Sequence, residues 1–133
     1  ATTEIYTLSL HDALPISQFI LLKAMADPGF DAQKKRFAAI LEKRYHAVKR
    51  FLAAHEAPEG FIALPFNSGY FMCFECKGFS AEKLRLKLLD ERGIGTISIQ
   101  DKWLRVAFSS VEEEHIDELY TEIFQAAAET SRA

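Results

Sequence analysis

The sequence predicts an α+β domain with the element order αα-ββ-α-ββ-α, in which helices pack on a small antiparallel or mixed sheet. Three observations support this fold class. Apolar residues recur at helical spacing in several segments, short runs rich in aromatic and β-branched residues lie between them, and turn-forming residues separate the two kinds of segment. With 133 residues, the chain is long enough to bury one hydrophobic core.

The first two helices are expected in the N-terminal half. Residues 18–26 form a short apolar helix that ends at Asp27-Pro28-Gly29, because proline cannot continue a helix. A long helix follows over residues 31–56, with Asp31 as its N-cap. Its expected buried stripe consists of Phe37, Ile40, Leu41, Tyr45, Val48, Phe51 and Leu52.

The two later helices are marked by their caps. Ser80 precedes a helix that runs to Arg92 and ends at Gly93, since glycine readily adopts the left-handed conformation found at helix C-termini. Ser110 and Glu113 have the spacing of a capping box, which predicts that the last helix starts at Ser110. The expected buried residues of the 80–92 helix are Leu84, Leu88 and Leu89.

Four short runs are expected to be strands. They cover residues 61–64, 70–76, 94–99 and 103–108. The short connection Gln100-Asp101-Lys102 predicts a hairpin between the last two strands. Because side chains alternate along a strand, Leu104, Val106 and Phe108 share one face, and Trp103, Arg105 and Ala107 share the other.

Two places in this pattern are candidates for ligand binding. Arg105 carries a permanent charge and a fork of donors that fits a carboxylate bidentately, although a solvated or salt-bridged arginine would give the same pattern. Asn67, Ser68 and Gly69 lie directly before a strand, where backbone and side chains can approach a ligand. An ordinary turn is the alternative for these three residues.

Composition excludes several classes of function. The net charge of -3 speaks against nucleic-acid or anionic-membrane binding, and the apolar runs are far shorter than the roughly 20 residues that cross a bilayer. Two cysteines favour a reducing, cytoplasmic location over a disulfide framework. Cys73 and Cys76 would face opposite ways on a strand, so we expect unlinked thiols and not a redox or metal pair. The scattered histidines indicate neither a zinc site nor a catalytic triad.

The start of the chain differs in character from the rest. Residues 1–17 lack an apolar period, and the string ATTEIYTLSLHDALPI resembles a translated sequencing adapter. We therefore expect residues 1–17 to be a non-native leader. Residues 18–133, including the long helix 31–56, are expected to form one domain of a protein that continues further toward its N-terminus.

Four segments taken together resemble the C-terminal small domain of class I/II, fold type I, pyridoxal-phosphate-dependent aminotransferases. They are the long helix, PFNSGYFMCFE, AEKLRLKLLDERGIGTISI and WLRVAFSSVEEEHIDELYTEIFQ. In that family an arginine in a hydrophobic-Arg-hydrophobic motif binds the α-carboxylate of the amino acid, and Arg105 falls on its position. The resemblance places Asn67, Ser68 and Gly69 in the same substrate site. Only Gln100-Asp101-Lys102 separates the last two strands here, where many members carry a longer Pro-Gly loop.

The resemblance also implies what this chain lacks. Pyridoxal phosphate and its Schiff-base lysine belong to the large domain, which is expected upstream, and no residue here maps onto that lysine, Lys23 included. The parent would transfer an amino group between an amino acid and a 2-oxo acid, as a homodimer, while this piece alone would be inactive.

Two alternatives to an aminotransferase stay open at this point. The first is a free-standing, non-catalytic α+β domain that binds a small carboxylate through Arg105. The second is an interaction module that uses the basic face of the long helix, but Glu42 and Glu56 dilute that face, which favours a solvated surface.

Overall fold

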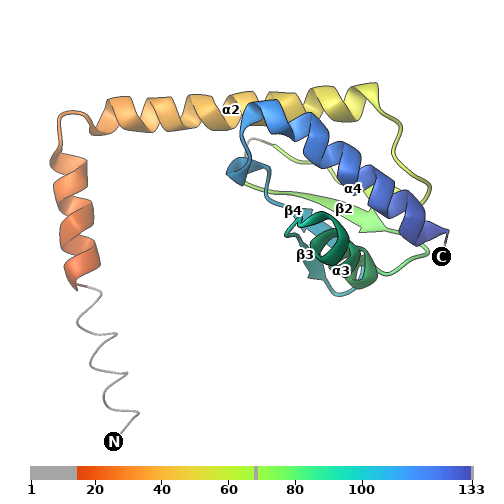
Figure 1. Ribbon diagram of the computed structural model, residues 1–133. Coiled ribbons are helices and arrows are strands. Elements are labelled where there is room, and N and C mark those ends of the chain that lie inside the picture. The colour runs from red at the N-terminus through yellow and green to blue at the C-terminus, as the bar shows by residue number, and fades with distance from the viewer. Residues whose placement is uncertain (1–14, 68, 133) are drawn as a thin grey trace, which may run out of the picture. The chain divides into compact units, whose positions relative to one another are not determined.

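The computed structural model describes residues 15–67 and 69–132. It divides into two compact units, Ala1–Ala38 and Ala39–Ala133, and each is described by itself. A helix covers residues 15–26. The further elements are α2 (Phe30–Ala54), β1 (Phe61–Ala63), β2 (Met72–Cys76), α3 (Ala81–Arg92), β3 (Ile97–Ile99), β4 (Trp103–Val106) and α4 (Ile116–Ser131), with two short 3₁₀ turns at Phe108–Ser110 and Glu113–His115 (Figure 1). The predicted fold class and element order are confirmed.

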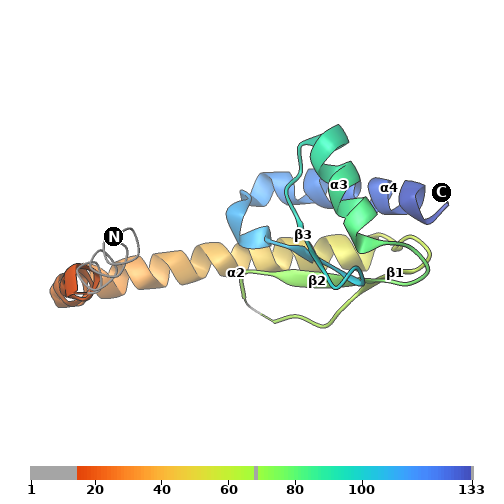
Figure 2. The ribbon, with the colours of Figure 1, turned by 90° about the horizontal axis from the view of Figure 1, so that it is seen from below.

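The sheet of the second unit is antiparallel throughout its described strands. Its strand order is β1-β2-β4-β3, so β4 returns from its hairpin with β3 to lie beside β2. Figure 2 shows α3 and α4 together on one side of this sheet. The antiparallel pairing of β3 with β4 confirms the predicted hairpin between the last two strands.

The core lies between the sheet and these helices. Phe74 and Leu104, neighbours in register on β2 and β4, are fully buried, and so are Leu84 of α3 and Tyr120 of α4. Phe74 stacks on Phe61 of β1 with ring centroids 4.2 Å apart. Because aromatic rings bury large areas and interdigitate, this cluster fixes which face of the sheet points inward.

Burial along α2 differs from the predicted stripe. Val48 and Phe51 are buried, but Phe37 is 51% exposed and Ile40 is 37% exposed. Leu89 on α3, also expected inside, is 45% exposed. Helical periodicity identifies an apolar face, whereas burial depends on whether another element covers that face.

The boundaries of several elements also differ from the predictions. Helix α4 begins at Ile116 and not at Ser110, because the Ser110 hydroxyl donates to the carbonyl of Ala107 at 2.8 Å inside a 3₁₀ turn. Glu113 lies in the next 3₁₀ turn and pairs with Arg50 at 3.5 Å, so the predicted capping box does not form. The strands are shorter than the apolar runs, since pairing ends where the backbone turns away.

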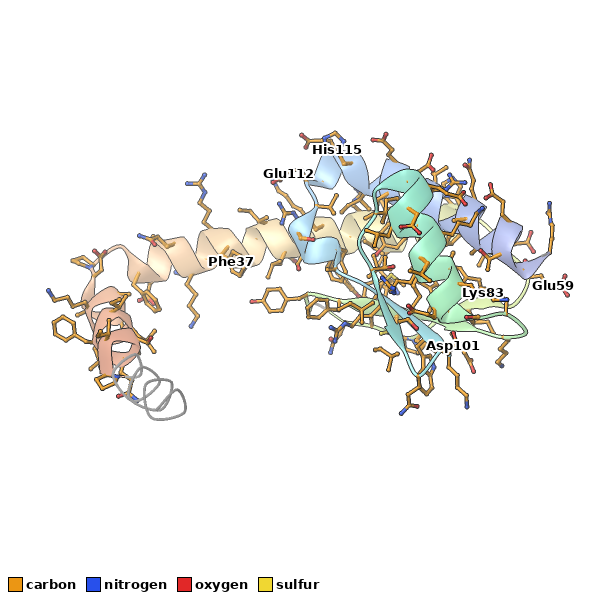
Figure 3. All side chains as sticks on the ribbon, turned by 60° about the horizontal axis from the view of Figure 1, so that its bottom comes forward. Phe37, Glu59, Lys83, Asp101, Glu112 and His115 are labelled. Carbon is orange, nitrogen blue, oxygen red and sulfur yellow. The ribbon has the colours of Figure 1, made fainter. Side chains whose placement is uncertain are left out.

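Both predicted caps of α3 are present. The Ser80 hydroxyl accepts from the Lys83 amide at 3.0 Å, and Gly93 adopts the left-handed conformation at φ 65°. Asp101 in the β3–β4 turn adds a contact that the sequence did not predict. Its carboxylate accepts from the Ser80 hydroxyl at 2.5 Å and from the Glu82 amide at 2.8 Å. Figure 3 shows Asp101 in this turn with Lys83 on the neighbouring helix.

These hydrogen bonds predict how stability changes with pH. The Ser80 and Glu82 hydrogen bonds hold the pKa of the Asp101 carboxyl below its usual value. A depressed pKa stabilises the fold above the ordinary carboxyl pKa of about 4, and this contribution is lost as pH falls through the folded-state pKa. We expect Asp101→Asn to lower the melting temperature at pH 7 and to flatten its fall below about pH 4.

Circular-dichroism melting curves between about pH 7 and pH 2 test this expectation. Asparagine suits the positive φ of 55° at this position, so the backbone is preserved. Asp90→Asn on the exposed surface of α3 is the matched control and should keep the wild-type acid limb. Equal acid slopes for Asp101→Asn and wild type would contradict the assignment.

Candidate functional site

The outer face of the sheet is the face directed away from the buried core, and it carries Arg105 near its middle. Strand register places Cys73, Arg105 and Ile97 in one row across β2, β4 and β3. The next row contains Ile62, Glu75, Trp103 and Ile99. Leu104 and Val106 are buried while Trp103 and Arg105 are half-buried, as the predicted alternation requires. None of these outer-face residues belongs to the core.

The Arg105 side chain packs on an aromatic ring and forms no ion pair with a described residue. Its guanidinium carbon lies 4.7 Å from the centroid of the Phe71 ring. Its Nε is sealed from solvent without a hydrogen-bond partner, and among the described residues no carboxylate lies within ion-pair distance of the group. The guanidinium is therefore half-buried, and no described acid occupies its terminal nitrogens.

The other arginines show how unusual this placement is within the described chain. Arg44 pairs with Glu112 at 2.7 Å, Arg85 pairs with Glu82 at 2.6 Å, and Arg92 pairs with Glu122 and Glu129. Arg50 pairs with Glu113, while Arg36 and Arg132 are exposed to solvent. Among described arginines, Arg105 alone is half-buried without an acid.

An acid on the same face, Glu75, pairs with a lysine and not with Arg105. Glu75 lies two residues from Cys73 on β2, so it is a diagonal neighbour of Arg105. Its carboxylate points to Lys77 Nζ, 3.7 Å away. A guanidinium that leaves its neighbouring carboxylate unused is available for an anion that is not part of the described chain.

Among the described residues, the structure provides no link between the other predicted site residues and Arg105. Asn67 is exposed and Gly69 is half-buried, in the segment that leads into β2, whereas Ser68 lies outside the described residues. No described hydrogen bond joins Asn67 or Gly69 to Arg105. The following residue, Tyr70, is held through its backbone, because its carbonyl accepts a hydrogen bond from the Ser109 amide at 3.3 Å. Their proposed substrate role stays a prediction.

The two cysteines are unlinked, as predicted. Cys76 lies on the inner face, where burial, with a smaller effect of Asp101 and Glu75, raises the pKa of its thiol to about 12. Cys73 lies on the outer face in register with Arg105. Among the described residues, no group of His, Cys, Asp and Glu side chains is arranged to hold a metal ion.

The described residues do not fit pyridoxal phosphate. A Schiff-base lysine needs a site that favours the neutral amine, yet the described lysines are exposed apart from Lys87. Hydrogen bonds to Glu91 and then Glu129 raise the pKa of Lys87. The 570 Å³ depression between α4 and the 56–59 and 77–79 loops is lined by Lys77 and Arg132, but Glu56 and Glu59 also line it and offset their charge, so it is not a distinct phosphate site.

Phe71 is the site residue that sequence reasoning missed. It falls within the strand predicted over residues 70–76, although β2 begins only at Met72, and it is 47% exposed, so nothing in the sequence analysis linked it to Arg105. The sequence held one usable signal, the two-residue period of a strand, which puts residues 71 and 73 on the same face. The register then makes Cys73 the partner of Arg105. An aromatic residue at that offset reaches a cross-strand arginine.

Comparison with known proteins is informative at the level of the fold. No protein family and no curated protein matches the chain by sequence. Among solved structures, the chain is similar to LysN, the α-aminoadipate aminotransferase of Thermus thermophilus complexed with N-(5'-phosphopyridoxyl)-L-leucine. The TM-score is 0.70 at 21% identity, over 83% of this chain and 30% of that enzyme. The likeness shows a shared fold, over less than a third of the enzyme's length. In addition, no described helix is long and apolar enough to cross a membrane.

Proposed function

We propose that this chain is the C-terminal small domain of a pyridoxal-phosphate-dependent aminotransferase and that Arg105 binds the α-carboxylate of its substrates. The observation that carries the proposal is Arg105 itself, half-buried, stacked on Phe71 and without a described acid partner. The fold shared with LysN supports the family. An amino acid and its 2-oxo acid have the α-carboxylate in common, so one bidentate arginine serves both half-reactions.

The proposal divides the active site between two domains. Pyridoxal phosphate supplies the electron sink when it is bound, and a large domain upstream of residue 18 would hold it, because the described residues offer no site for it. The contribution of this chain is to bind and orient the substrate at its carboxylate. Asn67, Ser68 and Gly69 are proposed to line the same site.

Carboxylate binding by the purified chain tests the role of Arg105 directly. We expect pyruvate, the probe 2-oxo acid, to shift the side-chain N–H signals of Arg105 in nitrogen-15 NMR spectra. A charge-assisted pair contributes about 1.5–3 kcal/mol, which corresponds to a dissociation constant of about 10–100 mM. The shift should saturate in that range.

Chloride at equal ionic strength and neutral pyruvamide control for nonspecific effects. Pyruvate should also shift the backbone amide signals of Cys73 and Ile97, the register partners of Arg105. Arg105→Lys should abolish this second saturable shift, because lysine keeps the charge but loses the planar fork. The matched control is Arg85→Lys, since Arg85 is already held by Glu82. Equal shifts with chloride and pyruvate would contradict carboxylate recognition.

A second candidate function is a free-standing domain that binds a carboxylate without chemistry, which the same half-buried guanidinium without an acid partner also supports. The coding sequence upstream of residue 18 distinguishes the two functions. An aminotransferase requires a large domain there with a Schiff-base lysine. An upstream sequence without such a domain, in a protein whose Arg105 binds pyruvate, would favour the non-catalytic domain.

A further inference from the structure

The contact between the Arg105 guanidinium and the Phe71 ring bears on how the guanidinium is oriented. Arginine side chains have several rotatable bonds, and binding a ligand with a mobile guanidinium costs conformational entropy. Arg105 has no ion pair or hydrogen bond among the described residues to restrict it, but its guanidinium carbon lies 4.7 Å from the Phe71 ring centroid. At that distance the ring attracts the cation and favours one orientation of its plane.

The backbone explains how the two side chains meet. Arg105 pairs with Cys73 across β2 and β4, and Phe71 lies two residues before Cys73 on the same side of the chain. Such diagonal positions are within reach of long and aromatic side chains. The sheet register therefore fixes this contact, since a shift by one residue would turn Arg105 toward the core.

The buried Nε indicates which donors remain. It has no accessible surface and no partner, while neither terminal nitrogen has a hydrogen-bond partner among the described residues. A guanidinium can meet a carboxylate through Nε and one terminal nitrogen or through both terminal nitrogens. With Nε enclosed, the end-on pair of terminal nitrogens is the one available.

We propose that Phe71 is the positioning residue of Arg105, holding the guanidinium so that its two terminal nitrogens face an incoming carboxylate. The carboxylate part of this inference rests on the proposed function. The ordering of Arg105 by Phe71 does not, because it concerns the ligand-free chain. The two parts are measured separately.

The first measurement is the mobility of Arg105 without ligand. Nitrogen-15 relaxation of the Arg105 Nε–H group in the full chain should give a high order parameter in wild type. Phe71→Leu, which keeps apolar bulk but removes the ring, should lower it clearly. Phe71→Tyr restores the ring and should restore the order parameter. Ile97→Ala, on the other register neighbour of Arg105, should leave it unchanged.

The second measurement is the pyruvate titration of the same variants. Phe71→Leu should weaken pyruvate binding about three- to tenfold, and Phe71→Tyr should bind like wild type. An amide fingerprint spectrum verifies folding, and Phe71→Met replaces Phe71→Leu if the latter does not fold.

The outcomes separate the inference from the proposed function. An unchanged order parameter in the ring-less variant overturns the inference, and so does unchanged pyruvate affinity where wild type binds. A reduced order parameter in a chain whose wild type does not bind pyruvate supports positioning by Phe71 and refutes the carboxylate role of Arg105.

Discussion

Phe74→Ala is expected to lower the free energy of unfolding by about 3–5 kcal/mol, because it removes a fully buried ring from the centre of the core. Phe74 stacks on Phe61, and it meets Phe124 edge-on with ring centroids 6.0 Å apart. Its ring also lies 6.3 Å from that of Tyr120. These neighbours come from β1 and α4, so the cavity would loosen the contact between sheet and helix.

This loss is a large fraction of the whole stability of a typical domain, which is about 5–15 kcal/mol. Urea unfolding followed by far-ultraviolet circular dichroism measures it as a lower midpoint. Ile97→Ala is the matched control, because Ile97 is 46% exposed on the outer face and should cost less than about 1 kcal/mol. Equal losses for the two variants would show that the inner and outer faces of the sheet are wrongly assigned.

Local signals in the sequence predicted much of this fold. Ser80 and Gly93 mark the ends of α3 because caps act through the backbone within a few residues. Alternation in the 103–106 segment placed Arg105 on the face opposite Leu104, since the two-residue period of a strand is fixed by its geometry. These features depend on near neighbours in the sequence and can be read there.

Features that depend on distant partners were missed or misplaced. Ser110 has the right spacing for a capping box, but its hydroxyl bonds to the Ala107 carbonyl within a 3₁₀ turn. Asp101 bonds to Ser80 across the packed β3–β4 turn, and nothing near Asp101 in the sequence indicates that contact. Phe37 lies on a predicted apolar stripe yet is half-exposed. The helical period identifies the apolar face of a helix, but it does not show which element, if any, covers that face.

The candidate site shows the same division. Arg105 is recognisable because one charged residue interrupts an apolar alternating run. Its lack of an acid partner is a property of the folded chain, since Glu75 lies on the same face and turns to Lys77. The sequence thus identified the residue, and the three-dimensional arrangement supplied the reason to regard its guanidinium as available.

The strongest functional consequence of an available guanidinium concerns the full-length enzyme that the proposed function requires. There, Arg105→Lys is expected to reduce kcat/KM for an amino acid about 10²–10³-fold. A bidentate, desolvated carboxylate contact contributes about 2–5 kcal/mol to binding, and lysine replaces the planar fork by a single ammonium group. Because donor and acceptor share the carboxylate, the KM of the 2-oxo acid should rise together with that of the amino acid.

A primary amine without a carboxylate provides the discriminating measurement. Steady-state kinetics with this donor should be nearly unchanged by Arg105→Lys, whereas a general loss of structure would reduce the rates with both donors alike. Arg85→Lys on α3, where the native arginine is already paired with Glu82, should leave both rates at the wild-type level. Equal losses with the amine and the amino acid would refute carboxylate recognition by Arg105, because the change in kcat/KM would then be independent of the group that the guanidinium is proposed to bind.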